Sequence, residues 1–132
     1  MTWLYHDAPL EEIPDGAYSF VYLITNLIDG RKYIGKKLFY FTKTKTIKGK
    51  KKKVKTESDW REYWSSSNEL KEDIQKLGQE NFKREILHIC PNKGTASYYE
   101  AKLQMVNEVL EYPDKWYNGQ IQVRVHKNHI KK

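Results

Sequence analysis

The stretch FVYLITNLIDGRKYIGKK, residues 20–37, limits the fold more strongly than any other part of the chain. β-branched and aromatic residues fill two short runs, and a polar connector with Asp-Gly at positions 29–30 separates them. Such a dipeptide between apolar runs is typical of a tight turn that joins two antiparallel strands. The stretch therefore predicts a β-hairpin with one tyrosine on each strand, Tyr22 and Tyr33.

Regular elements are also expected along the rest of the chain. The spacing of Leu70, Ile74 and Leu77 predicts an amphipathic helix, which Ser66 begins as a capping box with Glu69. The later helix is expected to bury a stripe made of Tyr99, Leu103, Val106 and Leu110. In chain order, the predicted elements are strands at Ser19–Asn26 and Arg31–Phe41, a short helix from Ser58-Asp59 through Trp64, a helix at Asn68–Leu77, a strand at Asn81–Cys90, a helix from Thr95 or Ser97 to about Leu110, and a final strand on which Ile121, Val123 and Val125 alternate. This order predicts an α/β domain of the α+β type, with a short antiparallel sheet and helices on its faces.

Positive charge is concentrated in one segment of the 132-residue chain, whose formal net charge is +7. Eight lysines and no acidic residue lie between Lys43 and Lys55, so the remainder of the chain is close to neutral. The alternating start of this segment suits an exposed ribbon that turns at Gly49, whereas the lack of an apolar face suits a disordered loop. Either the lysines form a solvated loop or they contact a polyanionic partner, most simply nucleic acid.

Several other classes of protein find no support in the composition. Cys90 is the single cysteine, so no intrachain disulfide can form and a reducing compartment is expected. The acidic N-terminal region is not a signal peptide, and no apolar run reaches the length of a membrane span, which together predict a soluble intracellular protein. The four histidines lack the spacing of metal ligands, and no phosphate-binding loop or nucleophile elbow is present.

The two triplets of the hairpin resemble the paired motif of the GIY-YIG nucleases. Phe20-Val21-Tyr22 stands in the place of the first triplet, and Tyr33-Ile34-Gly35 matches the second in full. The resemblance implies a small three-stranded antiparallel sheet flanked by helices, within a single nuclease domain over residues 1–132 that carries a Lys-rich insertion at 42–57 and a basic C-terminal tail. The W-x-x-Y-W-S-S-S run resembles stand-alone, phage-encoded and homing-type endonucleases of this family, which implies a place in the host cell cytoplasm.

The same resemblance implies a catalytic role for five residues. Tyr22 would take a proton from the attacking water, and Tyr33 would orient the water or the phosphate. Glu100 would hold a single Mg²⁺ or Mn²⁺ ion, and Asn118 would steady the site. Arg61 would stabilise the charge that develops on the phosphate, although Ser65 stands where the family often has a histidine. The implied activity is metal-dependent hydrolysis of phosphodiester bonds in DNA.

The lysines around these residues have two expected roles. Lys36 and Lys37 are expected to lower the pKa of the Tyr22 phenol, and Lys37 is the alternative to Arg61 as the phosphate-stabilising cation. The residues expected to contact DNA are Lys36, Lys37, Lys45, Lys48, Lys50, Lys51, Lys52, Lys53 and Lys55. Gly35 is expected to leave space near the substrate.

Each of these assignments has a structural alternative. Tyr22 and Tyr33 are also what a packed hairpin core would contain, and a glutamate such as Glu100 in the first turn of a helix is commonly solvated. The aromatic residues near Trp60 suit either base stacking or a helix core. The chain is accordingly either an endonuclease, a non-catalytic nucleic-acid-binding module, or an RNA- or ribosome-associated basic protein. DNA is the expected partner, without a membrane or a small-molecule cofactor, and the oligomeric state is left open.

Overall fold

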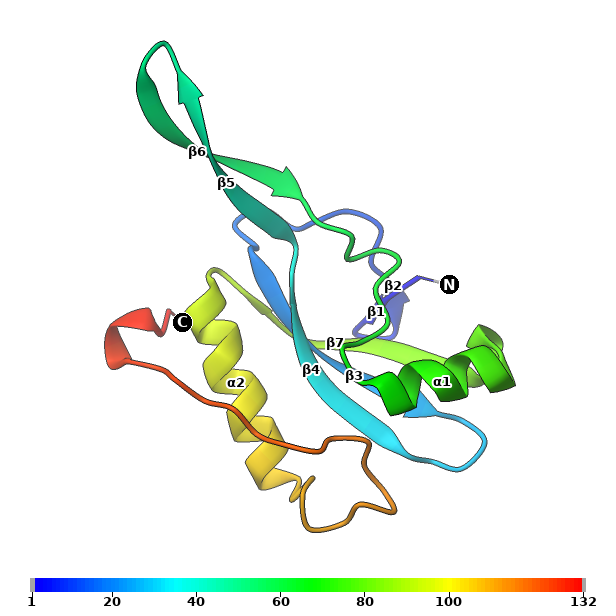
Figure 1. Cartoon of the computed structure of the whole chain (residues 1–132). Helices are drawn as coiled ribbons and strands as arrows, with labels where there is room; N and C mark the ends of the chain where they lie inside the picture. Colours follow the sequence, from blue (N-terminus) through cyan, green and yellow to red (C-terminus); the bar gives the residue numbers. More distant parts are fainter. Residues whose placement is uncertain (1, 132) are drawn as a thin grey trace.

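The computed structural model describes residues 2–131 and has a central sheet with strand order β2-β1-β7-β3-β4 (Figure 1). A separate pair of strands, β5 and β6, forms a second small sheet. The elements are β1 (Leu4–Tyr5), β2 (Ala8–Pro9), β3 (Ser19–Asn26), β4 (Lys32–Leu38), β5 (Tyr40–Ile47), β6 (Lys50–Glu57), α1 (Asn68–Leu77), a 3₁₀ turn (Gln79–Asn81), β7 (Phe82–Cys90), α2 (Lys93–Val106) and a 3₁₀ turn (Lys127–His129). The mixed α+β class is confirmed.

The hairpin expected from the Tyr22 and Tyr33 runs is present as β3 and β4, which pair antiparallel, and β7 pairs antiparallel with the other edge of β3. The expected count of three strands is wrong, because two-residue strands extend the sheet to five. β1 pairs parallel with β7, and it turns into β2 through His6 and Asp7, both with positive φ. Strands this short carry no periodic pattern, so the sequence gives no signal for them.

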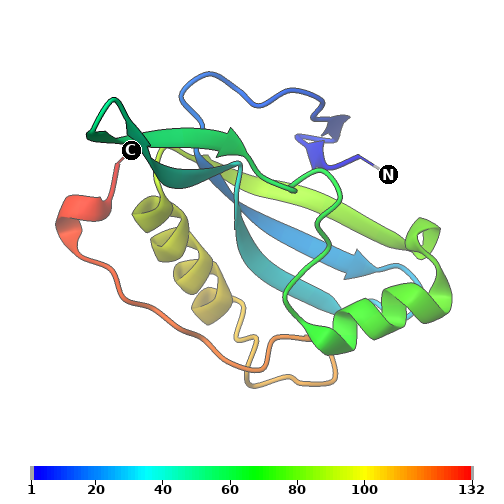
Figure 2. The same ribbon diagram turned by 45° about the horizontal axis from the view of Figure 1, so that its top comes forward.

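Each face of the central sheet packs against a different layer (Figure 2). α2 covers one face, where Val21 and Ile34 contact Ala96 and Val109. On the opposite face, alternate residues of the same strands join a larger aromatic core with the N-terminal segment and α1. That core includes Trp3, Phe20, Tyr22, Ile24, Phe39, Trp60, Leu70, Phe82 and Tyr117. Because side chains alternate along a strand, the hairpin supplies both cores at once.

The helix expected from Ser58-Asp59 to Trp64 is absent: residues 60–62 form turns and 63–65 are irregular. Trp60 is buried instead, and its carbonyl accepts a hydrogen bond from the Trp3 indole at 2.7 Å. Tertiary packing of aromatic side chains therefore replaces local helix formation in this segment. The next helix, α1, has the predicted bounds, but its N-cap is Ser67, whose hydroxyl accepts from the Leu70 amide, and not Ser66.

The boundaries and the buried face of α2 also differ from those expected. The helix begins at Lys93, with Asn92 as its N-cap, and ends at Val106. Val106 is 69% exposed and Leu110 is 47% exposed, so the expectation that these two residues are buried in the apolar stripe is wrong. Small and polar side chains are buried in its place, because the helix lies close against β3 and β4. They are Thr95, Ala96, Ala101 and Gln104.

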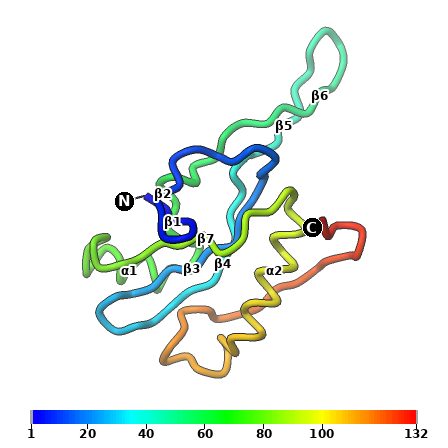
Figure 3. Tube along the Cα trace, turned by 180° about the vertical axis from the view of Figure 1, so that it is seen from behind, coloured from blue at the N-terminus to red at the C-terminus, as the bar shows by residue number. Residues whose placement is uncertain are grey.

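The Lys-rich segment forms a ribbon and not a disordered loop. β5 and β6 pair antiparallel over eight residues each and project away from the central sheet (Figures 1 and 3). The turn lies at Lys48 and Gly49, as expected, and both have positive φ, as a two-residue hairpin loop of the primed type requires. The second hairpin strand is interrupted at Phe39, a buried residue between β4 and β5.

The final strand expected at Ile121–Val125 is wrong, since residues 117–126 belong to no helix or strand. Figure 1 shows this segment running alongside α2 toward the C-terminus. Within the described residues, no helix combines the length and the apolar character that crossing a membrane would need.

Candidate active site

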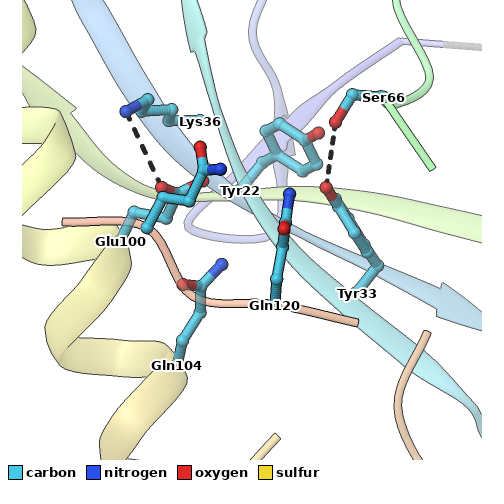
Figure 4. Close-up of a pocket in the computed structure, with 8 residues that line it drawn as sticks. Tyr22, Tyr33, Lys36, Ser66, Glu100, Gln104 and Gln120 are labelled. Atoms are coloured by element: carbon cyan, nitrogen blue, oxygen red, sulfur yellow. Dashed lines mark hydrogen bonds and ion pairs between the residues drawn. The ribbon is translucent and has the colours of Figure 1, made fainter. Parts of the chain in front are cut away.

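A cavity of about 220 Å³ lies at the edge of the central sheet, beside β4 (Figure 4). Both faces of the sheet contribute side chains to this cavity. β4 is an edge strand, so side chains from the two faces can meet beside it. The residues that line it are Tyr22, Tyr33, Lys36, Ser66, Glu100, Gln104, Gln120 and Gln122. Three of the five predicted catalytic residues are therefore brought together: Tyr22, Tyr33 and Glu100.

The two tyrosines are held against each other by Gly35. Tyr22 pairs with Gly35 across the hairpin, and the rings of Tyr22 and Tyr33 lie 6.1 Å apart. A Cβ atom at position 35 would lie 2.4 Å from the Tyr22 hydroxyl oxygen and 2.8 Å from Cε1 of Tyr33. Only glycine leaves room for this arrangement, so the last residue of the Tyr-Ile-Gly triplet has a steric role. Its expected role was to leave space for substrate; here the space is filled by the Tyr22 ring.

Tyr22 is both a core residue and a cavity residue, with 1% of its surface exposed. Burial first, and then the neighbouring Tyr33 and Tyr63, raise the pKa of its phenol well above the ordinary value. We expected Lys36 and Lys37 to lower this pKa, and this expectation is wrong for the structure described. The phenol is therefore protonated at neutral pH in the absence of further positive charge.

Tyr33 lies closer to solvent at the same edge of the sheet. Its hydroxyl lies 3.1 Å from the Ser66 hydroxyl, just before α1 (Figure 4). Burial raises the pKa of Tyr33, and the hydrogen bond with Ser66 lowers it again in part. This phenol is thus held in a fixed direction by a polar partner, as a group that orients a ligand must be.

Glu100 lies on α2 and faces the cavity from the side opposite Tyr33 (Figure 4). Its carboxylate is 3.8 Å from the Lys36 ammonium, and its side chain is only 14% exposed. Burial raises the pKa of Glu100, and the charge of Lys36 lowers it. Lys36 also donates to the Ser97 hydroxyl at 2.9 Å, so a cation and a carboxylate are fixed side by side in the cavity wall.

Asn118 is buried beside the cavity and fixes the edge strand without lining it. Its side-chain oxygen accepts from the Ile34 amide at 3.1 Å, and its side-chain nitrogen donates to the Ile34 carbonyl at 2.8 Å. Gln104, one turn after Glu100, donates to the same carbonyl at 3.0 Å. These two amides replace the strand partner that the edge of β4 lacks, and they hold Gly35 and Lys36 in place.

Lys37 points away from the cavity. Its ammonium lies 2.6 Å from Asp59 and 4.1 Å from the centre of the Tyr63 ring, and this ion pair lowers the pKa of Asp59. Tyr63 in turn lies edge-on against Tyr22, with ring centres 6.2 Å apart. The Tyr63 ring therefore lies between the Lys37 ammonium and Tyr22.

Arg61 lies outside the cavity. Its guanidinium contacts Glu57 at 3.4 Å, donates to the Glu11 carbonyl and packs on the Trp60 ring, with 40% of the side chain exposed. The structure thus does not bring Arg61 to the other predicted catalytic residues. The cation that it does place in the cavity is Lys36.

Four cavity residues were not predicted as site residues from the sequence: Ser66, Gln104, Gln120 and Gln122. Gln104 follows Glu100 by one helical turn, which places both on one face of α2 and was a usable signal. Gln120 and Gln122 alternate with Ile121, so an extended chain directs both to one side. Ser66 comes near Tyr33 only through the irregular segment before α1, which local patterns do not predict.

The donor set of the cavity suits a hard divalent cation bound mainly through water. Among the described residues that line the cavity, Glu100 is the one acidic side chain, and nowhere in residues 2–131 do three His, Cys, Asp or Glu side chains form a metal-binding group. Mg²⁺ commonly keeps several waters and binds through one or two carboxylates together with substrate phosphates. The cavity has room for a cation with several waters, since a water occupies about 30 Å³.

Comparison with protein families assigns the chain to a group. A family model described as "Putative endonuclease segE, GIY-YIG domain" matches residues 3–121. The chain therefore belongs to this GIY-YIG family, as the two hairpin triplets predicted, and membership implies a nuclease whose substrate is nucleic acid. No curated protein and no solved structure matched the chain in the parallel comparisons.

Proposed function

We propose that the protein is a metal-dependent DNA endonuclease whose catalytic site is the cavity beside β4. The observation that supports this most is the convergence of Tyr22, Tyr33, Lys36 and Glu100 in one cavity. They come from β3, β4 and α2, and a purely structural core has no need to place a carboxylate and an ammonium beside two phenols. The family match supports the nuclease class.

Glu100 is the proposed ligand of a single Mg²⁺ or Mn²⁺ ion. Its carboxylate is partly desolvated and lines the cavity together with Tyr22, Tyr33 and Lys36. A bound divalent cation would neutralise charge on the scissile phosphate and lower the pKa of nearby hydroxyl groups. The protein's own contribution is to hold one carboxylate in a fixed direction, which Lys36 and the packing of α2 on β4 achieve.

Tyr22 is the proposed acceptor of the proton from the attacking water, and Tyr33 orients that water or a phosphate oxygen through its hydroxyl. Because burial holds Tyr22 in its protonated form, it can accept a proton only after positive charge in the cavity has lowered its pKa. Lys36 is the proposed cation for the charge that develops on the phosphate, in place of Arg61 and Lys37. The ion pair with Asp59 and the distance from the cavity leave Lys37 a secondary role.

Plasmid nicking tests this proposal directly. Purified protein should relax supercoiled plasmid with Mg²⁺ or Mn²⁺ and not with a chelator, and Glu100→Gln should reduce the rate at least 100-fold while DNA binding survives. Glu85→Gln is the matched control, because Glu85 also faces a lysine, Lys83, at 3.6 Å but lies on β7 away from the cavity. Equal cutting by Glu100→Gln and the wild type would disprove the metal assignment.

A second candidate is a DNA-binding module without nuclease activity. Two features favour it: Arg61 is engaged outside the cavity, and burial raises the pKa of the Tyr22 phenol well above its ordinary value. This candidate predicts DNA binding by the wild type with no nicking under any metal condition, and an unchanged affinity for Glu100→Gln. A phage origin and a location in the host cell cytoplasm, which the W-x-x-Y-W-S-S-S run implied, stay predictions.

A further inference from the structure

We propose that the sugar–phosphate backbone of one DNA strand runs from the catalytic cavity past a second, lysine-lined cavity, and that the duplex then lies on one particular face of the β5–β6 ribbon, the face that carries Phe41. This inference rests on the proposed function, because the DNA enters it as the substrate of the first cavity. The general expectation was that the lysines contact DNA. The proposal adds which cavity the DNA backbone passes, which groove of the DNA the ribbon enters and which face of the ribbon binds.

A second cavity, of about 210 Å³, connects the two parts of this path. It is lined by Ser19, Lys36, Lys37, Leu38, Phe41, Lys93 and Ala96. Lys36 also lines the catalytic cavity, and Phe41 is the second residue of β5, so the cavity lies between the site and the base of the ribbon. Three of its lining residues are lysines, as a phosphate backbone leaving the site would require.

The pairing register divides the ribbon into two unlike faces. Residues opposite each other in an antiparallel pair point to the same side, and alternate residues point to opposite sides. The Phe41 face carries Phe41, Lys43, Lys45, Ile47, Lys50, Lys52, Val54 and Thr56. The other face carries Tyr40, Thr42, Thr44, Thr46, Lys51, Lys53, Lys55 and Glu57. The Phe41 face thus has four lysines and no acid, whereas the other has three lysines and Glu57.

The two faces of the ribbon also make different contacts at the end where the ribbon joins the domain. On the second face, the Thr42 hydroxyl lies 2.6 Å from the Tyr18 hydroxyl, and the Lys55 ammonium packs 4.6 Å from the centre of the Tyr40 ring. The first contact ties that face to the body of the protein, and the second covers part of it from within the ribbon. Phe41 is 40% exposed, borders the second cavity and lies with its ring centre 5.1 Å from the ammonium of Lys37, which lines the same cavity. The Phe41 face is therefore the one that continues from the catalytic site.

The dimensions of the ribbon suit the major groove of B-form DNA. Eight residues of strand span about 26 Å, which corresponds to roughly 8 base pairs at 3.4 Å each. The B-form major groove admits a two-stranded ribbon, whereas the major groove of an RNA duplex is too narrow for side chains to enter. Figure 3 shows the ribbon projecting clear of the domain, so a duplex could follow it without meeting the sheet.

Two variants of equal charge test which face binds. Lys45→Gln/Lys50→Gln/Lys52→Gln changes the Phe41 face, and Lys51→Gln/Lys53→Gln/Lys55→Gln changes the other. Affinity for a 30-base-pair DNA duplex is measured against salt concentration, with chelator present so that nothing is cut. Each lost phosphate contact should lower the slope of log K against log salt by about 0.9. We expect a drop of about 2 to 3 for the first variant and of less than about 1 for the second.

Equal drops in the two variants, or a larger drop in the second, would overturn the proposal. An RNA duplex of the same sequence should bind more weakly than DNA and show no difference between the two variants; preferential RNA binding would also overturn it. Nicking is measured separately on the same proteins. A wild type that binds through the Phe41 face without cutting would refute the nuclease, and with it the path from a catalytic cavity, while leaving the assignment of the binding face intact. Cutting with equal slopes for the two variants would support the nuclease and refute the assignment of the face.

Discussion

The cavity beside Gly35 and the β5–β6 ribbon place functional groups in opposite physical settings. In the cavity, Tyr22 is almost fully buried and Glu100 is held by α2, so both positions are fixed by packing. On the ribbon, every lysine is exposed, and neither strand contributes to the central sheet. Changes in the cavity should therefore affect chemistry or the folding of the whole domain, whereas changes on the ribbon should affect DNA binding and only the local stability of the ribbon.

The largest effect is expected for Tyr22→Phe. The ring still fills its place in the aromatic core, so the free energy of unfolding should change by less than about 1 kcal/mol. If Tyr22 accepts the proton from the attacking water, as proposed, losing its hydroxyl should lower the nicking rate about 100-fold or more, the size commonly found for general acid–base groups. Tyr99→Phe, on α2 and stacked on His88 with ring centres 4.5 Å apart, is the control and should cut normally. Normal cutting by Tyr22→Phe would remove the phenol from the mechanism.

Gly35→Ala should damage both folding and catalysis. The new methyl group would overlap the Tyr22 hydroxyl and the Tyr33 ring, and overpacking of this kind costs about 1–3 kcal/mol. Urea unfolding followed by tryptophan fluorescence measures the loss. Gly119→Ala is a matched control, because no atom lies within 4 Å of a Cβ at that position. An unchanged unfolding midpoint for Gly35→Ala would mean that the two tyrosines are less tightly packed than described.

The contrast also explains how much could be predicted from the sequence. The β3–β4 hairpin, α1 and the turn at Gly49 follow from alternation, helical spacing and turn chemistry, which are local. The positions of Lys36 and Arg61 relative to the cavity do not follow from local patterns. The position of Lys36 depends on which edge of the sheet is free, and that of Arg61 depends on its packing against Trp60. Motif spacing therefore pointed to Tyr22, Tyr33 and Glu100, which the cavity brings together, and to Arg61, which lies outside it. Their catalytic roles stay predictions.

The motif residues were predictable because each lies on a regular element with a fixed direction. Asn118 shows the limit of that approach: it was expected near the site, yet its role depends on hydrogen bonds to Ile34, 84 positions away in the chain. Ser66 was expected to begin α1, and it contacts Tyr33 instead. In both cases tertiary contacts determine the role, and local patterns carry no information about them.

A smaller effect, on pH dependence, is expected for Lys36→Gln. Burial raises the pKa of Glu100 and Lys36 lowers it, so removing Lys36 should raise it further. Cutting needs the ionised carboxylate, and the acid limb of the nicking profile should therefore move to higher pH. The pKa of Glu100 is higher in the folded protein than in the unfolded chain, where it is about 4.5. The contribution of Glu100 to the free energy of unfolding is therefore largest below pH 4.5 and is lost as the pH rises through the pKa of the folded protein.

Profiles from pH 4 to 8, each scaled to its own maximum, separate this shift from the loss of rate that Lys36→Gln also causes. Lys102→Gln serves as the control, since Lys102 lies on α2 near the Tyr99 ring and does not line the cavity. An acid limb that stays in place would show that Lys36 does not act on Glu100.

The smallest effect is expected on the ribbon, and its sign should be the reverse of that in the cavity. Lys45 lies directly opposite Lys52, and like charges in that position destabilise a strand pair, so Lys45→Thr should stabilise the ribbon by a few tenths of a kcal/mol. Lys51→Thr removes the same charge opposite Thr46 and should be close to neutral. Hydrogen-bonded and non-hydrogen-bonded pairs alternate along the ribbon from the two-residue turn, which makes Lys43 and Val54 a hydrogen-bonded pair. Amide hydrogen exchange at Val54 therefore measures local opening of the ribbon, which global unfolding does not report. Slower exchange in Lys45→Thr at low salt, and no difference at high salt, would show that the ribbon keeps opposed lysines at a cost to its own stability; faster exchange would contradict that conclusion.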